Sequence, residues 1–313
     1  MLRTRYDYKT ARLCFILFIV LSADETISET MTLWNRQSGV DYKTAVWAYY
    51  RYYPSEVAAI IFTVLFALAT FAHLYQLFRH RTWFFIPFVI GGFFEWVGYI
   101  GRILSSNESP NWSLGPYIQQ TILILLAPAL FAASIYMMLG RIVMLLDAEQ
   151  HCIFRKKWLT KFFVCGDVLS FTVQAAGGGV MSSGSLSSVH NGEKIVIAGL
   201  AIQILFFGFF VITCALFHRR VNKSPTEPSL ELGSSWRKHL HILYAANMLI
   251  LIRSVFRLIE YAMGNNGYLL RHEVFLYVFD GVLMLTAMIL FNAFHPSGLI
   301  SRRGKGIEMN GNV

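Results

Sequence analysis

The sequence has little charge. Only 14% of its 313 residues are Asp, Glu, Lys or Arg, whereas soluble domains carry about 25%. Hydrophobic residues make up 55% of the chain and aromatic residues 15%. A chain this apolar would expose large hydrophobic patches and aggregate in water. The composition therefore argues against a soluble enzyme, a disordered chain and a secreted disulfide scaffold, and it favours one integral membrane domain.

Motifs for catalysis and metal binding are also missing. The four cysteines form no CxxC pair, and the chain holds no HExxH, GxSxG or GxxxxGK[ST] pattern. We therefore expect no enzyme, no catalytic residue, no metal and no cofactor. The net charge of +9 would suggest nucleic acid in a soluble protein. In a membrane protein the same excess belongs to cytoplasmic loops, so no nucleic-acid partner is expected.

Long apolar segments are what the sequence does have. A membrane helix needs about 20 mostly apolar residues, and seven segments meet this requirement: 55–78, 83–104, 117–139, 161–181, 194–217, 240–263 and 273–294. The sequence therefore predicts an all-α integral membrane protein with seven transmembrane helices.

The distribution of Lys and Arg predicts the orientation of these helices. The loops 79–82, 140–161, 218–239 and 295–313 together hold 15 Lys and Arg, and the alternate loops hold 2. Because basic loops stay in the cytoplasm, we expect the N-terminus outside and the C-terminus inside. Two glycosylation sequons, at Asn107 and Asn111, then lie outside, which predicts a glycoprotein.

Three regions follow from these spans. We expect an N-terminal extracytoplasmic segment at 1–54, a seven-helix domain at 55–294 and a cytoplasmic tail at 295–313. Residues 1–23 have the basic start and short apolar core of a secretory signal peptide. An uncleaved apolar stretch, or translation from Met31, is the alternative.

Charged residues inside the membrane are costly, so each one is a candidate functional residue. Six of them are predicted to share the outer half of the bilayer, and three glutamines join them as candidate ligand-binding residues. The nine are Glu95, Arg102, Gln119, Gln120, Gln174, Arg253, Arg257, Glu260 and Asp280. One interpretation is an ion-pair network that fixes helix packing. The other is a polar cavity for the head group of an amphipathic ligand. The two are compatible.

Other residues interrupt the spans. Pro128 predicts a hinge or a packing feature in the third span, and Gly177, Gly178 and Gly179 predict close backbone approach or a break in the fourth. Asp167 lies alone near the inner end of the fourth span. We expect it to cap the helix or to pair with cytoplasmic Lys or Arg.

Linked motifs resemble a known family. They include Glu95-x-x-Gly98-Tyr99-x-x-Arg102, Ala127-Pro128, Asp167-Val168-Leu169-Ser170-Phe171-x-x-Gln174, Arg253-x-x-Phe256-Arg257-x-x-Glu260 and Glu273-x-x-x-Tyr277-x-Phe279-Asp280. Over about 52–298 the chain resembles the fungal lipid-translocating exporter family, also described as resistance-to-aminocholesterol-like proteins. Ser297 stands where that family is expected to have Gly.

The resemblance implies transport or translocation (export or flipping) of amphipathic lipid-like molecules and resistance to lipophilic toxicants. The implied partners are membrane lipids or amphipathic small molecules, and the expected location is the plasma membrane. No oligomeric state is predicted. A seven-helix receptor or sensor of lipophilic ligands is the alternative, although the chain lacks the Asp-Arg-Tyr and Asn-Pro-x-x-Tyr motifs of the largest receptor class.

Overall fold

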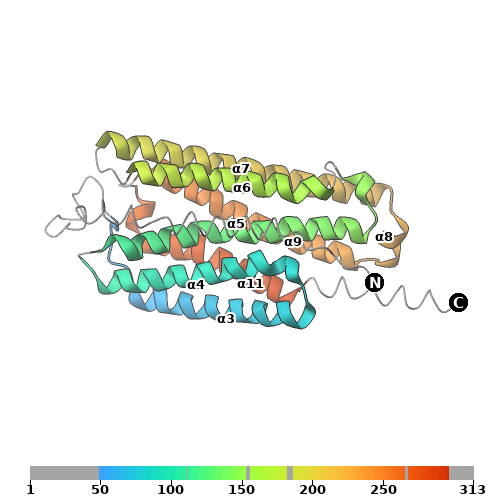
Figure 1. The fold of residues 1–313 in the computed structure, drawn as a ribbon, viewed down its shortest axis with the longest axis horizontal. Coiled ribbons are helices and arrows are strands. Elements are labelled where there is room, and N and C mark those ends of the chain that lie inside the picture. Colours follow the sequence, from blue (N-terminus) through green and yellow to red (C-terminus); the bar gives the residue numbers. More distant parts are fainter. Residues whose placement is uncertain (1–48, 111, 153–155, 182–185, 265–266, 296–313) are drawn as a thin grey trace.

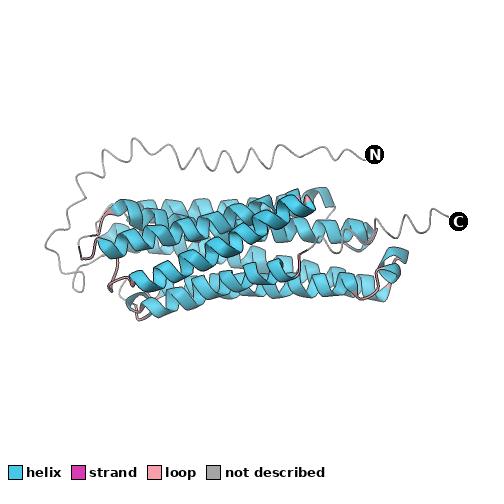
Figure 2. Ribbon diagram, turned by 90° about the horizontal axis from the view of Figure 1, so that it is seen from below, coloured by secondary structure: helices cyan, strands magenta, loops and turns pink. Residues whose placement is uncertain are grey.

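The structure is a computed structural model, and it describes residues 49–110, 112–152, 156–181, 186–264 and 267–295. Within these ranges the chain forms helices and turns and no strand. The long helices run side by side along the long axis of the molecule (Figure 1, Figure 2). In the described part of the chain, seven spans are long and apolar enough to cross a membrane. The predicted fold class, an all-α integral membrane protein with seven spans, is confirmed.

Six of the spans are single long helices, with short 3-10 turns at some of their ends. They are α3 (Glu56–His80), α4 (Ile86–Asn107), α5 (Leu114–Leu145), α6 (Lys156–Met181), α7 (Leu186–Lys223) and α9 (Ser235–Ala262). The seventh span joins α10 (Glu273–Leu276), a π-helical segment η4 (Tyr277–Val282) and α11 (Leu283–Ala293). A short helix, α8 (Glu227–Glu231), connects α7 to α9. Several helices begin before the predicted span because their polar end residues extend the helix beyond the apolar stretch.

The helices contact one another in chain order around a closed ring. Each of α3, α4, α5, α6, α7 and α9 packs on the next, and α11 closes the ring by contacting both α9 and α3. In addition, α5 contacts α9 across the middle. This order places the C-terminal ends of α4 and α9 near the N-terminal ends of α5 and α10, and most of the candidate residues lie toward this end of the bundle.

The first span shows how the sequence sets a helix end. The Ser55 side chain accepts a hydrogen bond from the backbone N–H of Ala58, and Glu56 lies in the first turn. Arg79 and His80 occupy the last turn, and Arg81 ends the helix with φ of 52°. Polar caps, an acidic start and a basic end all stabilise a helix of this direction.

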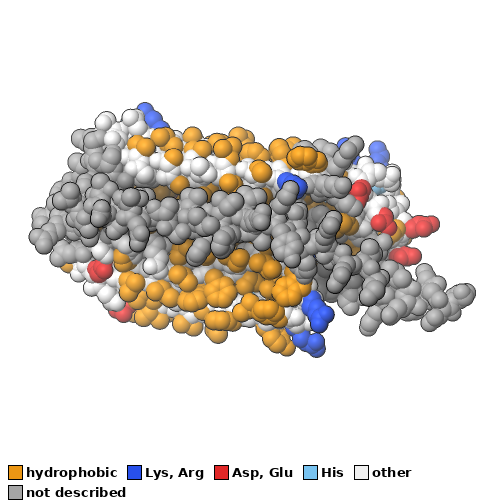
Figure 3. Space-filling view, viewed as in Figure 1, with side chains coloured by type: hydrophobic (Ala, Val, Ile, Leu, Met, Phe, Trp, Pro, Cys, Tyr) orange, Lys and Arg blue, Asp and Glu red, His pale blue; other side chains and the backbone are white. Residues whose placement is uncertain are grey.

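The surface agrees with a membrane protein. Apolar side chains cover the middle of the molecule, and charged side chains gather toward its two ends (Figure 3). Val57, Leu68 and Tyr75 on α3 are 68%, 64% and 68% exposed. Apolar residues this exposed on a long apolar helix are expected to face lipid.

Some predictions fall outside the described residues. These are the signal peptide at 1–23, the sequon at Asn111 and the tail after residue 295. Asn107 is described and is the last residue of α4. The orientation of the chain in the membrane stays a prediction.

Candidate functional site

Asp280 lies at the centre of a group of buried charges between α9 and η4. Its Oδ1 is 3.0 Å from Nε of Arg253, and both side chains are fully buried. Arg257 pairs with both carboxylate oxygens, and its Nε donates to Oδ1 at 3.1 Å. Arg257 also pairs with Glu260, three residues later on α9, at 2.6 Å. One carboxylate therefore joins two guanidinium groups, and the helical spacing of Arg257 and Glu260 adds a second carboxylate.

Pro128 explains how Arg253 is held from the other side. Proline has no N–H, so in α5 it leaves the carbonyl four residues earlier without its helical donor. That carbonyl belongs to Ile124, and it accepts a hydrogen bond from Nη2 of Arg253 at 2.9 Å. The proline predicted as a hinge or packing feature thus frees a backbone acceptor for a buried cation.

Glu95 is the exception among these charges. It lies on α4, it is 0% exposed, and neither carboxylate oxygen has a hydrogen-bond partner among the described residues. Arg253, Arg257 and Asp280 interact with it electrostatically. We call Glu95, Arg253, Arg257, Glu260 and Asp280 the buried ion network.

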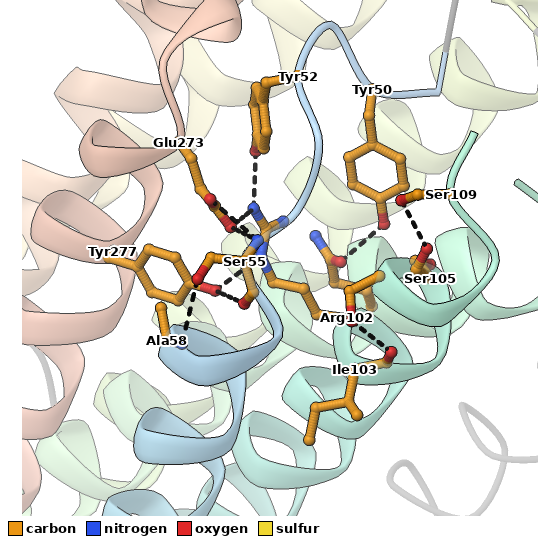
Figure 4. Close-up of polar contacts among 12 residues, drawn as sticks. Tyr50, Tyr52, Ser55, Ala58, Arg102, Ile103, Ser105, Ser109, Glu273 and Tyr277 are labelled. Carbon is orange, nitrogen blue, oxygen red and sulfur yellow. Dashed lines mark hydrogen bonds and ion pairs between the residues drawn. The ribbon is translucent and has the colours of Figure 1, made fainter.

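Arg102 forms a separate group nearer the C-terminal end of α4. Its Nη2 is 2.7 Å from Oε1 of Glu273 and 2.9 Å from the hydroxyl of Tyr52, and its Nε donates to Tyr277 at 3.0 Å (Figure 4). The Glu273 carboxylate also accepts the backbone N–H of Ser55 at 2.8 Å. This Arg102 group therefore joins the start of α3, the end of α4 and the start of the seventh span.

A short aromatic segment, residues 49–52, closes the same end of the bundle. The hydroxyl of Tyr50 donates to Oε1 of Gln120 on α5 at 2.8 Å. The Tyr50 ring makes edge contacts with Trp112 and Tyr117 at 5.3 and 5.6 Å between centroids. Burial raises the pKa of Tyr50 to about 12, so its hydroxyl is a neutral donor at physiological pH.

Beneath this aromatic segment is a cavity of about 100 Å³. Charged walls come from Arg51, Arg102, Arg257, Glu193 and Glu260, and His272 lies beside them. Apolar and aromatic residues complete the lining, among them Tyr117, Ile124, Leu125, Met181, Tyr261 and Leu276. The cavity thus touches the buried ion network through two members, Arg257 and Glu260, and the Arg102 group through Arg102 and Tyr52. It combines charged groups with an apolar floor, which is the composition of a site for an amphipathic molecule.

The three predicted glutamines separate in space. Gln120 lines the cavity. Gln119 donates to the backbone carbonyl of Val97 at 2.9 Å and so links α5 to α4. Gln174 donates to Ser170 at 2.8 Å and to Gln203 at 3.3 Å, between α6 and α7. The structure therefore brings Gln120 to the cavity and places Gln174 in a different helix interface.

The three consecutive glycines of α6 differ in how closely neighbouring atoms approach them. A Cβ atom on Gly177 would lie 2.8 Å from the backbone N of Val196 and 2.9 Å from the carbonyl of Gly192, so this glycine permits close approach of α7. At Gly178 and Gly179 an added Cβ would meet no atom within 4 Å. The helix continues to Met181, so the three glycines do not break it.

Asp167 is not a helix cap, and that expectation is wrong. The helix begins at Lys156, eleven residues earlier, and Asp167 is 4% exposed. Tyr136 on α5 is the polar side chain that interacts with it. The sequence interpretation failed because the span was taken to begin at residue 161, which moved Asp167 toward the membrane surface.

Several site residues were missed by the sequence reasoning. Glu273 and Tyr277 were noted as part of a motif and not as site residues, and Tyr50, Tyr52 and Glu193 were not considered. Their common signal is that acidic and tyrosine residues flank the outer ends of the predicted spans. Spacing alone does not reveal that residues 49–52 fold back over the bundle. Among the described residues no group of three or more His, Cys, Asp or Glu is arranged to hold a metal ion.

The chain is similar to known fungal membrane proteins. A family model described as "RTA1 like protein" matches residues 88–303. Protein RTA1 of Saccharomyces cerevisiae is 40% identical over 79% of this chain and 84% of its own length. Protoporphyrin uptake protein 1 of the same species is 37% identical over 78% of this chain and 90% of its own length. Sphingoid long-chain base transporter RSB1, also from Saccharomyces cerevisiae, is 27% identical over 80% of this chain and 74% of its own length. No solved structure matches the chain.

These relatives support membrane transport as the class of function, and two of them are named for the uptake or transport of amphipathic molecules. The match spans the residues that form the buried ion network, Glu95 to Asp280. The chain therefore belongs to the RTA1-like family of fungal membrane proteins, the lipid-translocating family that its linked motifs resemble.

Proposed function

We propose that the protein transports amphipathic molecules that carry a cationic head group and a long apolar tail, and that the cavity under the aromatic segment is where the head group binds. The observation that carries this proposal is the lining of that cavity. Glu193 and Glu260 line it beside tyrosine rings and aliphatic side chains. Carboxylates attract an ammonium group, aromatic faces attract cations, and the apolar floor suits the first carbons of a tail.

The cavity lining itself holds Arg51, Arg102 and Arg257 beside Glu193 and Glu260; the preference for a cationic ligand comes from the two buried groups next to the cavity, which hold more carboxyls than arginines. In the buried ion network and the Arg102 group together, the arginines are Arg102, Arg253 and Arg257, and each contacts a carboxylate. The carboxyls are Glu95, Glu260, Glu273 and Asp280, one more than the arginines. A long-chain base has the matching charge, and one relative is named for sphingoid long-chain bases.

The structure corresponds to a closed form in this proposal. Ligand sites generally measure about 300–1,000 Å³, whereas this cavity measures about 100 Å³. Tyr50 holds the aromatic segment in place through its hydrogen bond to Gln120. Opening would require this bond to break, at a cost of about 1 kcal/mol, and the rings to leave Trp112 and Tyr117.

The proposal includes a cellular role and an orientation. We propose export from the plasma membrane and resistance to lipophilic toxicants, with the cavity outside. Basic residues support this orientation, because Arg79, Arg81, Arg219, Arg220 and Lys223 lie at the opposite end of the bundle from the cavity. A tag at each terminus, probed with antibody before and after permeabilising cells, tests the orientation.

Flux in reconstituted vesicles tests the function. Vesicles that hold the purified protein are expected to move a labelled long-chain base across the bilayer faster than empty vesicles. Glu260→Gln is expected to reduce this flux about tenfold, because a charge-assisted contact is worth about 1.5–3 kcal/mol. Glu227→Gln, the same change on the exposed helix α8, serves as the matched control. Binding of the base without flux would contradict transport and favour a receptor.

A further inference from the structure

The buried ion network contains more acid than base. Arg253 and Arg257 carry two positive charges, and Glu260 and Asp280 balance them through direct pairs. Glu95 is the third carboxyl, and it has no hydrogen bond to any described residue. With Glu95 ionised the network has a net charge of −1, and with Glu95 protonated it is neutral.

A lone carboxylate in this position would be costly. Glu95 is fully buried in a helix that crosses the membrane. Moving an unpaired ionised carboxylate into such an environment costs so much free energy that the group takes up a proton instead. In the closed form, Glu95 is therefore expected to hold a proton.

We propose that Glu95 is the proton-binding site of the transporter and that one proton leaves it for each cationic head group that binds. This inference rests on the proposed function and adds the ion that is exchanged. In the step the carboxyl O–H bond breaks, its electron pair stays on oxygen, and the proton passes to water. The charge of the site is zero before and after, because an ammonium group replaces a proton. A chain without a P-loop motif for ATP thereby gains a way to use a proton gradient.

The contacts show how Glu95 and the cavity communicate although Glu95 does not line it. Arg257 lines the cavity, and it pairs with Glu260 in the cavity wall and with Asp280 behind it. Asp280 in turn pairs with Arg253, which interacts with Glu95. When Glu95 ionises it competes for these arginines. Arg257 then pairs less strongly with Glu260, so the Glu260 carboxylate becomes available to bind the head group.

The charged neighbours of Glu95 come from two elements. Arg253 and Arg257 face it from α9, and Asp280 faces it from η4. On its own helix Tyr99 interacts with it, and α3 contributes the rings of Phe62 and Phe66, which stack on Tyr99. From α5 the Ile124 carbonyl fixes Arg253. Both cations near Glu95 are thus tied to other acceptors as well, which allows them to shift between carboxylates.

Equilibrium binding at different pH tests this inference. The probe is a fluorescent long-chain trimethylammonium amphiphile, whose charge does not change with pH, and the purified full-length protein is held in lipid nanodiscs. If binding releases one proton, the affinity of the wild type for the probe increases about tenfold for each unit by which the pH is raised, up to the pH at which Glu95 is half ionised. About one proton per bound probe is also released in weakly buffered solution. Glu95→Gln keeps this position neutral, as in the protonated form, so it is expected to bind the probe more weakly, with no pH dependence and no proton release.

Matched variants and a neutral ligand complete the test. Asp167→Asn, a change at the other buried carboxyl without a hydrogen bond, is expected to keep the slope of the wild type. Glu95→Asp retains a titratable group and is also expected to keep a slope, which provides the test if Glu95→Gln does not fold. A long-chain alcohol of equal length is expected to release no proton.

The outcomes separate the two proposals. Proton release that is unchanged in Glu95→Gln, or a flat affinity profile for the wild type, overturns the role of Glu95 while the transport function stands. No binding of the cationic probe by the wild type at any pH overturns both.

Discussion

Two buried carboxyls, Glu95 on α4 and Asp167 on α6, have similar burial and opposite surroundings. Glu95 and Asp167 are 0% and 4% exposed, and neither has a hydrogen bond to its carboxylate oxygens among the described residues. Glu95 faces Arg253 and Arg257, whereas Asp167 faces Tyr136, whose ring packs on Phe163 and Phe210.

The difference teaches that burial alone does not make a functional acid. Asp167 has an aromatic neighbourhood and, within the described chain, no cation that interacts with it, so we expect it to keep its proton and act in packing. Arg253 and Arg257 interact electrostatically with Glu95, and both also pair with other carboxylates. Only the second arrangement allows a proton to be exchanged for another cation.

The largest effect on stability is expected when Asp280, the acceptor that Arg253 and Arg257 share, is replaced. Asp280→Asn leaves Arg253 and Arg257 buried with too few anionic partners, and breaking a buried pair of this kind costs about 3–5 kcal/mol. Thermal unfolding in detergent is expected to show this loss. Asp167→Asn, the matched change on α6, is expected to cost less than about 1 kcal/mol. Equal losses would contradict the distinction between the two carboxyl environments.

The Arg102 group offers the next largest effect. Arg102→Lys keeps the charge but cannot reach Glu273, Tyr52 and Tyr277 together, because a lysine ammonium is a single point. We expect a loss of about 1–3 kcal/mol and faster amide exchange at the start of α3, where Glu273 holds Ser55. Arg141→Lys on α5, whose guanidinium lies 4.2 Å from the Phe84 ring, is the control for the same change toward the inner end. Unchanged exchange near Ser55 would show that the group does not fix this helix end.

A smaller effect is expected at the aromatic segment. Tyr50→Phe removes the hydrogen bond to Gln120 while keeping the ring contacts, so the closed form loses about 1 kcal/mol. The association rate of the cationic probe is then expected to rise about fivefold. Tyr53→Phe, on the exposed ring that follows the aromatic segment, is the control. An equal rate in both variants would argue that the segment does not gate the cavity.

The smallest effect is expected at Glu95. If this carboxyl is already neutral in the closed form, Glu95→Gln changes the free energy of unfolding by less than about 0.5 kcal/mol. Chemical unfolding at pH 7 measures this value. A loss as large as that of Asp280→Asn would mean that Glu95 is ionised and paired, and would remove the basis for proton exchange.

Much of the architecture follows from the sequence. Apolar stretches of sufficient length predict the seven spans, and the helical spacing of Arg253, Arg257 and Glu260 predicts that they share a face. Counting residues along each span predicts a common depth for Glu95, Arg102 and Asp280, whereas the structure places Arg102 in a separate group with Glu273. These properties depend only on positions along single helices.

Contacts between helices could not be predicted in this way. Gln174 lies on α6, which packs beside α7, so its depth along the span did not show that it faces Gln203 and not the cavity. Arg102 pairs with Glu273 because the end of α4 meets the start of α10. The carbonyl of Ile124 accepts a hydrogen bond from Arg253 because α5 contacts α9 across the ring. Each of these depends on the order of helices around the bundle, which one sequence does not specify.

The central claim is that the buried ion network exchanges a proton for a cationic amphiphile, and counter-flow measures this exchange most directly. Vesicles that contain the protein and an internal pH dye receive the long-chain trimethylammonium amphiphile from outside. The account predicts a rise in internal pH with the wild type and Asp167→Asn, and no rise with Glu95→Gln or empty vesicles. An equal rise with Glu95→Gln, or amphiphile entry into wild-type vesicles without any change in internal pH, would contradict it.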